Sequence, residues 1–137
     1  MPKYNLTWQD TDAQLLDALL LATGGEGNTG LQDVLLMADA VDGTVFTLDE
    51  LEQGLQKLLA VGFVTVQKNK LALTPEFLEK YEQITLQEDS ATDNQKPLIK
   101  LLQQQPLSEE KIEEVRSTVL KKYKLKNHYQ QYLEQFG

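Results

Sequence analysis

The sequence predicts a mainly α-helical protein with a small β-hairpin, an α+β fold. Leucines recur at helical spacing along much of the chain. Two short runs rich in strand formers, 63–66 and 71–74, flank a polar turn. The 137 residues are 41% hydrophobic and 25% charged, which fits one globular domain with or without an appendage. We therefore expect helices to supply most of the core.

The first two helices are predicted on either side of a glycine-rich segment. The first runs over 12–23, because Thr11-Asp-Ala-Gln14 has the form of a capping box and a leucine stripe follows it. The second runs over 30–40 and opens at another such box, Thr29-Gly-Leu-Gln32. The segment between them, GGEGNTG, is expected to be a hinge.

The third helix has the clearest start in the chain. Thr47-Leu-Asp-Glu50 is a capping box, and Gly62 is placed to end the helix. The hairpin follows directly, and Pro75 then stands at the first position of a fourth helix. Together these elements form a predicted domain over 11–82.

A polar linker is predicted over 83–97, followed by a C-terminal helical segment over 98–137. Ser108 is expected to cap the longest helix of this segment. The helical phase slips near 124–127, where Asn127 is expected to cap a last helix. The aromatic residues of the segment are either core or the interface of a homodimer. They are Tyr123, Tyr129, Tyr132 and Phe136.

One motif invites a nucleotide-binding interpretation. Gly25-Glu-Gly27-Asn-Thr-Gly30 matches the G-x-G-x-x-G pattern of dinucleotide-binding loops. That pattern needs a strand before it, whereas a leucine-rich helix precedes it here. Glu26 also places a negative charge where phosphate would lie. We expect neither a nucleotide nor any other cofactor.

The chain offers few groups for catalysis or metal binding. It has no cysteine and one histidine, His128, which has no serine or carboxylate at a suggestive spacing. Asp39-Ala-Val-Asp-Gly43 departs from a calcium loop, because Val41 stands where an oxygen ligand is needed. We therefore predict a non-enzyme without a bound metal.

No stretch has the length and hydropathy of a membrane span or of a signal peptide. The lack of cysteine fits a reducing compartment. These features lead us to expect a cytoplasmic protein without a membrane partner.

Residues 46–77 resemble the core of winged helix-turn-helix domains. The resemblance rests on the capped helix at Thr47 with its leucines, then Gly62-Phe-Val, then Leu73-Thr74 closing the hairpin. It extends over about 11–82, in the order helix, helix, capped helix, hairpin, helix. In that family the third helix is the recognition helix and the hairpin is the wing. The resemblance therefore implies DNA binding.

The residues on the predicted solvent face of the third helix are poorly suited to DNA binding. Duplex binding depends largely on Lys and Arg that neutralise phosphates, but acidic residues outnumber lysine on this face. No arginine precedes Arg116, so bidentate arginine–guanine contacts are unavailable in this part of the chain. The candidate contact residues on the helix and wing are Asp49, Glu50, Glu52, Gln53, Gln56, Lys57, Lys68 and Lys70.

The net charge of −8 is divided unevenly along the chain. Residues 1–95 carry 5 Lys, 9 Asp and 7 Glu, a net −11, whereas 96–137 carry 7 Lys, 1 Arg and 5 Glu, a net +3. A basic cluster in the second part is the polar side of a helix, or a contact to phosphates, to an acidic partner or to the protein's own acidic body. Its members are Lys121, Lys122, Lys124 and Lys126.

Two functions follow from these patterns. The first is a non-catalytic winged-helix module that acts through protein–protein contacts, as a regulatory or scaffold subunit with an unknown partner. The second is a DNA-binding transcriptional regulator that uses the third helix, the wing and the basic C-terminal helix. The acidic third helix favours the first, because it opposes entry into a DNA groove.

Overall fold

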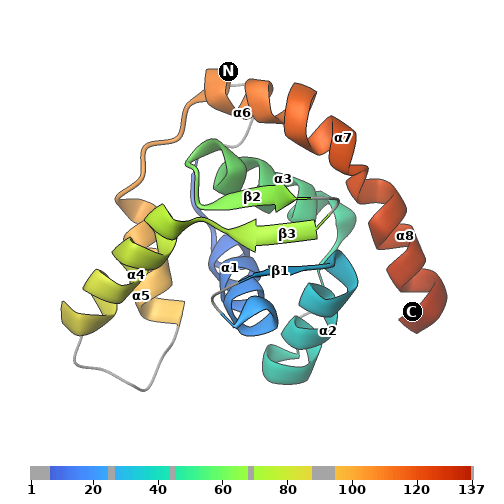
Figure 1. The fold of residues 1–137 in the computed structure, drawn as a ribbon, viewed down its shortest axis with the longest axis horizontal. Helices are drawn as coiled ribbons and strands as arrows, with labels where there is room; N and C mark the ends of the chain where they lie inside the picture. Colours follow the sequence, from blue (N-terminus) through green and yellow to red (C-terminus); the bar gives the residue numbers. More distant parts are fainter. Residues whose placement is uncertain (1–6, 25–26, 44–45, 68–69, 88–94, 137) are drawn as a thin grey trace.

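The computed structural model describes residues 7–24, 27–43, 46–67, 70–87 and 95–136. It is mainly helical with one small antiparallel sheet, in agreement with the predicted fold class (Figure 1). The N-terminal elements, in chain order, are α1 (Asp10–Thr23), β1 (Asn28–Thr29), α2 (Leu31–Asp42), α3 (Leu48–Ala60), β2 (Val64–Gln67), β3 (Lys70–Leu73) and α4 (Pro75–Gln87). The C-terminal elements are α5 (Gln95–Gln103), α6 (Glu109–Val115), the π-helical turn η1 (Arg116–Leu120), α7 (Lys121–Tyr123) and α8 (Leu125–Phe136).

The sheet contains the predicted hairpin and one strand that was not predicted. β2 and β3 pair with Val64 opposite Leu73, and β1 pairs with the other edge of β3, with Asn28 opposite Ala72. The glycine-rich segment is therefore more than a hinge, because its end adds a strand to the sheet. A two-residue strand has no periodic signal of its own, and its partner lies far along the chain.

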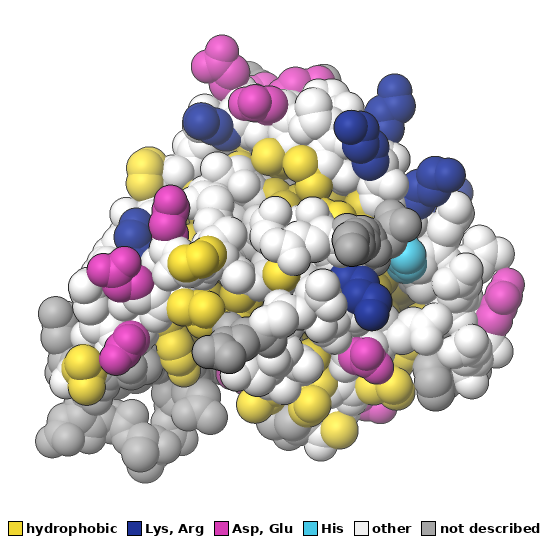
Figure 2. All heavy atoms as spheres, in the orientation of Figure 1, with side chains coloured by type: hydrophobic (Ala, Val, Ile, Leu, Met, Phe, Trp, Pro, Cys, Tyr) yellow, Lys and Arg dark blue, Asp and Glu magenta, His cyan; other side chains and the backbone are white. Residues whose placement is uncertain are grey.

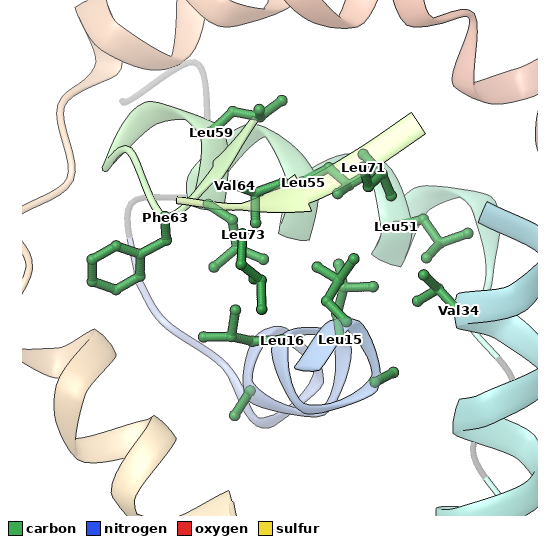
Figure 3. Close-up of a cluster of buried hydrophobic side chains, with 14 of the residues drawn as sticks. Leu15, Leu16, Val34, Leu51, Leu55, Leu59, Phe63, Val64, Leu71 and Leu73 are labelled. Carbon is green, nitrogen blue, oxygen red and sulfur yellow. The ribbon is translucent and has the colours of Figure 1, made fainter. Parts of the chain in front are cut away.

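The core is one hydrophobic cluster that begins with the leucines of α1. Leu15 and Leu16 point from α1 toward α3 and the hairpin, where Leu55 and Leu73 meet them (Figure 3). Residues from the C-terminal segment complete the same cluster. They are Leu98, Leu101, Leu102, Leu120, Tyr123 and Leu125. The C-terminal helices thus pack on the body of the protein instead of forming a separate unit.

Helical structure extends into the range predicted as a linker. α4 continues through 83–87, and α5 already begins at Gln95. α5 packs against both α1 and α4, and its Leu98 is fully buried. The rest of the predicted linker, 88–94, lies outside the described residues.

The cap of α3 is confirmed, whereas the cap of α1 differs from the prediction. The Thr47 Oγ1 accepts a hydrogen bond of 3.1 Å from the Glu50 amide, and the Glu50 carboxylate accepts one of 2.9 Å from the Thr47 amide. At α1 the N-cap is Gln9, whose amide donates to Asp12 at 2.9 Å, so the helix starts two residues earlier than predicted. At α2 the N-cap is Gly30.

Replacement of Thr47 by alanine tests the α3 cap. We expect the free energy of unfolding to fall by about 1 kcal/mol, because one amide at the helix start loses its acceptor. Urea unfolding measures the loss. Thr47→Ser keeps an acceptor oxygen and serves as the control, so an equal loss in both variants would contradict this account.

Candidate functional site

The surface of α3 is the first candidate site, because the winged-helix resemblance places the recognition helix there. In the structure, the C-terminal arm (α6 through α8, 109–136) passes across this helix (Figure 1). Both α6 and α8 contact α3, and Ile112 of α6 is fully buried. Much of the face predicted to be free is therefore covered by the chain itself.

The prediction that Lys57 faces solvent is wrong. Its side chain is fully buried, and its Nζ lies 2.5 Å from an Asp12 carboxylate oxygen. The same ammonium donates to the backbone carbonyl of Thr7 at 2.9 Å and lies 5.7 Å from the centre of the Trp8 ring. The start of α1 and the residues before it thus enclose Lys57, and no surface contact can use it.

Gln56 is buried as well, which corrects a second predicted contact residue. Only 2% of it is exposed, and its side-chain oxygen accepts a hydrogen bond of 3.3 Å from Arg116. The same guanidinium makes an ion pair with Glu52 at 3.0 Å. Arg116 of the arm therefore joins two polar side chains of α3. The polar face of this helix is divided between the start of α1 and the arm.

The remaining predicted residues on α3 and the hairpin stay near the surface. Asp49 is exposed and accepts a hydrogen bond of 2.9 Å from Gln53, while the Glu50 carboxylate is used by the helix cap. Lys70 is exposed on β3, whereas Lys68 lies outside the described residues. The accessible part of α3 therefore carries acidic and amide groups.

The basic cluster of the arm borders a pocket of about 400 Å³ at the start of α3. Leu48, Leu120 and Leu125 form its apolar wall. The charged lining residues are Glu52, Arg116, Lys121, Lys124 and Lys126. Figure 2 shows Lys and Arg side chains gathered over the part of the molecule where Figure 1 places α7 and the start of α8. Three of the four predicted lysines are thus brought together with an arginine.

Lys122 differs from the other members of the predicted cluster. It is exposed, like them, but it does not line the pocket. Sequence reasoning grouped all four lysines and missed Arg116, Leu48 and Leu120, since only the docking of the arm on α3 brings these residues together.

The backbone of the arm is irregular at this pocket. The turn Arg116–Leu120 is π-helical, and Lys124 adopts a left-handed conformation with φ 58° and ψ 55°. The predicted break of the helical phase is confirmed at Lys124. The prediction that Asn127 caps the last helix is wrong, because α8 already begins at Leu125. The break changes the direction of the chain, so that residues on both sides of it line one pocket.

The aromatic residues of the arm attach it to the body of the protein. Tyr123 is 1% exposed and belongs to the core cluster, and its ring stacks on His128 with 4.6 Å between ring centres. The Tyr129 hydroxyl donates to the Phe46 carbonyl at 3.0 Å, while Tyr132 packs half-buried against the core. For Tyr123 the core interpretation is therefore confirmed. The side chain of Phe136 lies outside the described part.

The hydroxyl of Tyr123 is buried and has no hydrogen-bond partner among the described residues. Burial raises the pKa of this phenol above its ordinary value, because the charged phenolate would lose its hydration. The hydroxyl is enclosed by packed side chains and is separate from the pocket lining. We therefore expect this hydroxyl to affect the stability of the fold and not a reaction at the pocket.

The described residues contain neither a metal-binding group nor a membrane-spanning helix. In residues 7–24, 27–43, 46–67, 70–87 and 95–136, no group of three or more histidine or carboxylate side chains is placed to hold a metal ion. Within the same ranges no helix combines the length and the apolar character needed to cross a bilayer.

Comparisons with protein-family models, with curated proteins and with solved structures return no match. Any function for this chain therefore rests on its own residues.

Proposed function

We propose that this chain is a non-catalytic winged-helix module that acts through protein–protein contacts, as a regulatory or scaffold subunit. The order of three helices followed by a hairpin supports the winged-helix assignment. The observation that carries the function is the docking of the arm on α3. A helix whose polar side chains are already bonded within the protein has few groups left for bases.

The electrostatics of α3 add to this argument. Of the three residues of α3 that could contact bases or phosphates, Gln56 and Lys57 are buried, and Gln53 donates a hydrogen bond of 2.9 Å to Asp49. Arg116 brings positive charge to the helix, but Glu52 pairs with it. The exposed carboxylate of Asp49 would repel phosphate. Entry of α3 into a DNA groove would therefore require both removal of the arm and compensation of negative charge.

The second candidate function is DNA binding through the arm. The observation that favours it is the gathering of Arg116, Lys121, Lys124 and Lys126 around one pocket. Phosphate contacts from such a group would give affinity without sequence reading.

A salt titration with mixed-sequence duplex DNA distinguishes the two functions. We expect binding weaker than a Kd of about 10⁻⁴ M at physiological salt, the weak end of non-specific binding. Fluorescence anisotropy at about 50 mM and 200 mM salt measures it. The variant Lys121→Glu/Lys126→Glu is the comparison. Tight binding with a steep salt dependence that this variant abolishes would replace the proposed function with DNA binding by the arm.

A further inference from the structure

The pocket at the start of α3 combines an apolar wall with a basic rim. We infer that it is the docking site for an acidic peptide segment of a partner protein, with a bulky apolar side chain seated against Leu48, Leu120 and Leu125. This inference rests on the proposed function, because it names the chemistry of the protein partner.

Charge supports an acidic partner. Arg116 and Glu52 offset each other by forming an ion pair. Lys121, Lys124 and Lys126 are exposed, and they form no ion pair within the described part of the chain. Three uncompensated lysines around one opening create a local positive potential on a protein whose net charge is −8. Complementary charge guides the encounter and selects against basic partners.

The apolar wall indicates that the acidic segment must also carry a bulky apolar side chain. Leu48 is half-buried at the first position of α3, and the other two apolar lining residues, Leu120 and Leu125, are buried. A volume of about 400 Å³ accommodates a bulky side chain together with neighbouring backbone. Burial of an apolar anchor in such a pocket supplies affinity, while the charged rim supplies orientation.

The irregular backbone provides an independent observation. The π-helical turn contributes Arg116 and Leu120 to the pocket, and the left-handed residue Lys124 is itself part of the lining. In a regular helix Arg116, Leu120 and Lys124 would share one face, but Leu125 and Lys126 would lie on other sides. The break at Lys124 therefore brings these last two residues to the same opening. π-Turns and left-handed non-glycine residues are concentrated at functional sites.

The surroundings favour a short acidic peptide over duplex DNA. A duplex carries charge along its whole length, and stable binding needs many phosphate contacts. α6 continues the arm away from the pocket with four exposed glutamates, Glu109, Glu110, Glu113 and Glu114, against one exposed lysine, Lys111. Figure 2 shows acidic side chains over this part of the arm. A duplex lying along the arm meets this charge, whereas a short peptide needs only the pocket.

The test is binding of a fluorescein-labelled peptide, Asp-Glu-Asp-Leu-Phe-Asp-Glu-Asp, to the full chain at about 0.15 M salt, where the Debye length is about 8 Å. We expect saturable binding in the micromolar range. The variant Lys121→Glu/Lys126→Glu is expected to bind roughly tenfold more weakly, because two favourable rim contacts become repulsive. Leu48→Ser tests the apolar wall and is also expected to weaken binding.

Lys122→Glu is the matched control, since it makes the same charge change in the same segment but outside the pocket. We expect Lys122→Glu to change the affinity for the peptide less than twofold relative to the parent. The single variant Lys121→Glu is measured beside it and is expected to weaken binding more. A control peptide with Ser-Ser in place of Leu-Phe keeps the charge and removes the anchor. Equal weakening by Lys121→Glu and Lys122→Glu, equal affinity for both peptides, or no saturable binding at about 1 mM would each overturn the inference.

Failure of the acidic-peptide inference can be distinguished from failure of the proposed function. If the peptide does not bind and DNA does not bind either, the pocket assignment is wrong and the protein-contact function stands. If mixed-sequence duplex binds more tightly than the peptide, with a steep salt dependence, both are wrong. A second copy of this chain could also occupy the pocket with its acidic body, and sedimentation of the free protein tests this. Self-association that is lost in Lys121→Glu/Lys126→Glu would identify a second copy as the occupant and overturn the partner assignment.

Discussion

Replacement of Lys57 by methionine is expected to lower the free energy of unfolding by about 3–5 kcal/mol, the cost of breaking a buried ion pair by removal of one partner. Methionine fills a similar volume, so the loss comes mainly from the Asp12 carboxylate, which remains buried without its cation. The Thr7 carbonyl also loses its donor. Urea unfolding followed by circular dichroism measures the change.

The double variant Asp12→Asn/Lys57→Met separates this cause from packing. Asparagine keeps an oxygen that accepts from the Gln9 amide but carries no charge, so the double variant is expected to recover most of the loss. Lys70→Met changes an exposed lysine and is expected to stay within about 0.5 kcal/mol of the parent. A double variant as unstable as Lys57→Met would show that the charge of Asp12 is not responsible.

Replacement of Tyr123 is expected to cause the second large change in the free energy of unfolding, and the sign of the change depends on the residue introduced. Tyr123→Ala removes a large, fully buried ring from the core and is expected to cost about 3–5 kcal/mol. Tyr123→Phe removes only the hydroxyl that has no partner among the described residues, so it is expected to stabilise the protein by about 1 kcal/mol. Thermal and urea unfolding measure both changes. Destabilisation by phenylalanine would indicate that the hydroxyl has a hydrogen-bond partner in solution.

The same residue predicts a pH dependence. Burial raises the pKa of Tyr123 in the folded protein, so folding favours the protonated phenol. Its contribution to stability is fully present below the unfolded pKa of about 10 and is lost as the pH rises from there toward the folded pKa. We expect the parent to lose stability faster than Tyr123→Phe above about pH 10. Equal slopes for the two proteins would contradict the burial of this phenol.

These two residues also bear on function, because they hold elements that define the surface of α3. Lys57 attaches α3 to the start of α1, and Tyr123 anchors the arm in the core next to the pocket. Peptide and DNA binding should therefore be measured in variants that keep both residues. Changes at Lys121, Lys122 and Lys126 meet this condition, since these side chains are exposed.

Much of the fold followed from local patterns. The leucine spacing predicted α1, α2 and α3, the capping box predicted the start of α3 at Thr47, and the alternating runs predicted the hairpin. Such patterns are informative because a cap or an amphipathic stripe depends on residues within a few positions of one another. The break at Lys124 was predictable for the same reason, as a slip of helical phase.

The sequence alone determined the apolar faces of the helices, the hairpin and the chemical types that could occupy a site. Only the tertiary structure decided which polar groups reach solvent. Spacing shows that Gln56 and Lys57 lie on the polar side of α3, but the start of α1 and the arm cover that side. β1 and the basic pocket likewise join segments far apart in the chain. Helical periodicity describes one element at a time, whereas burial depends on how the elements dock.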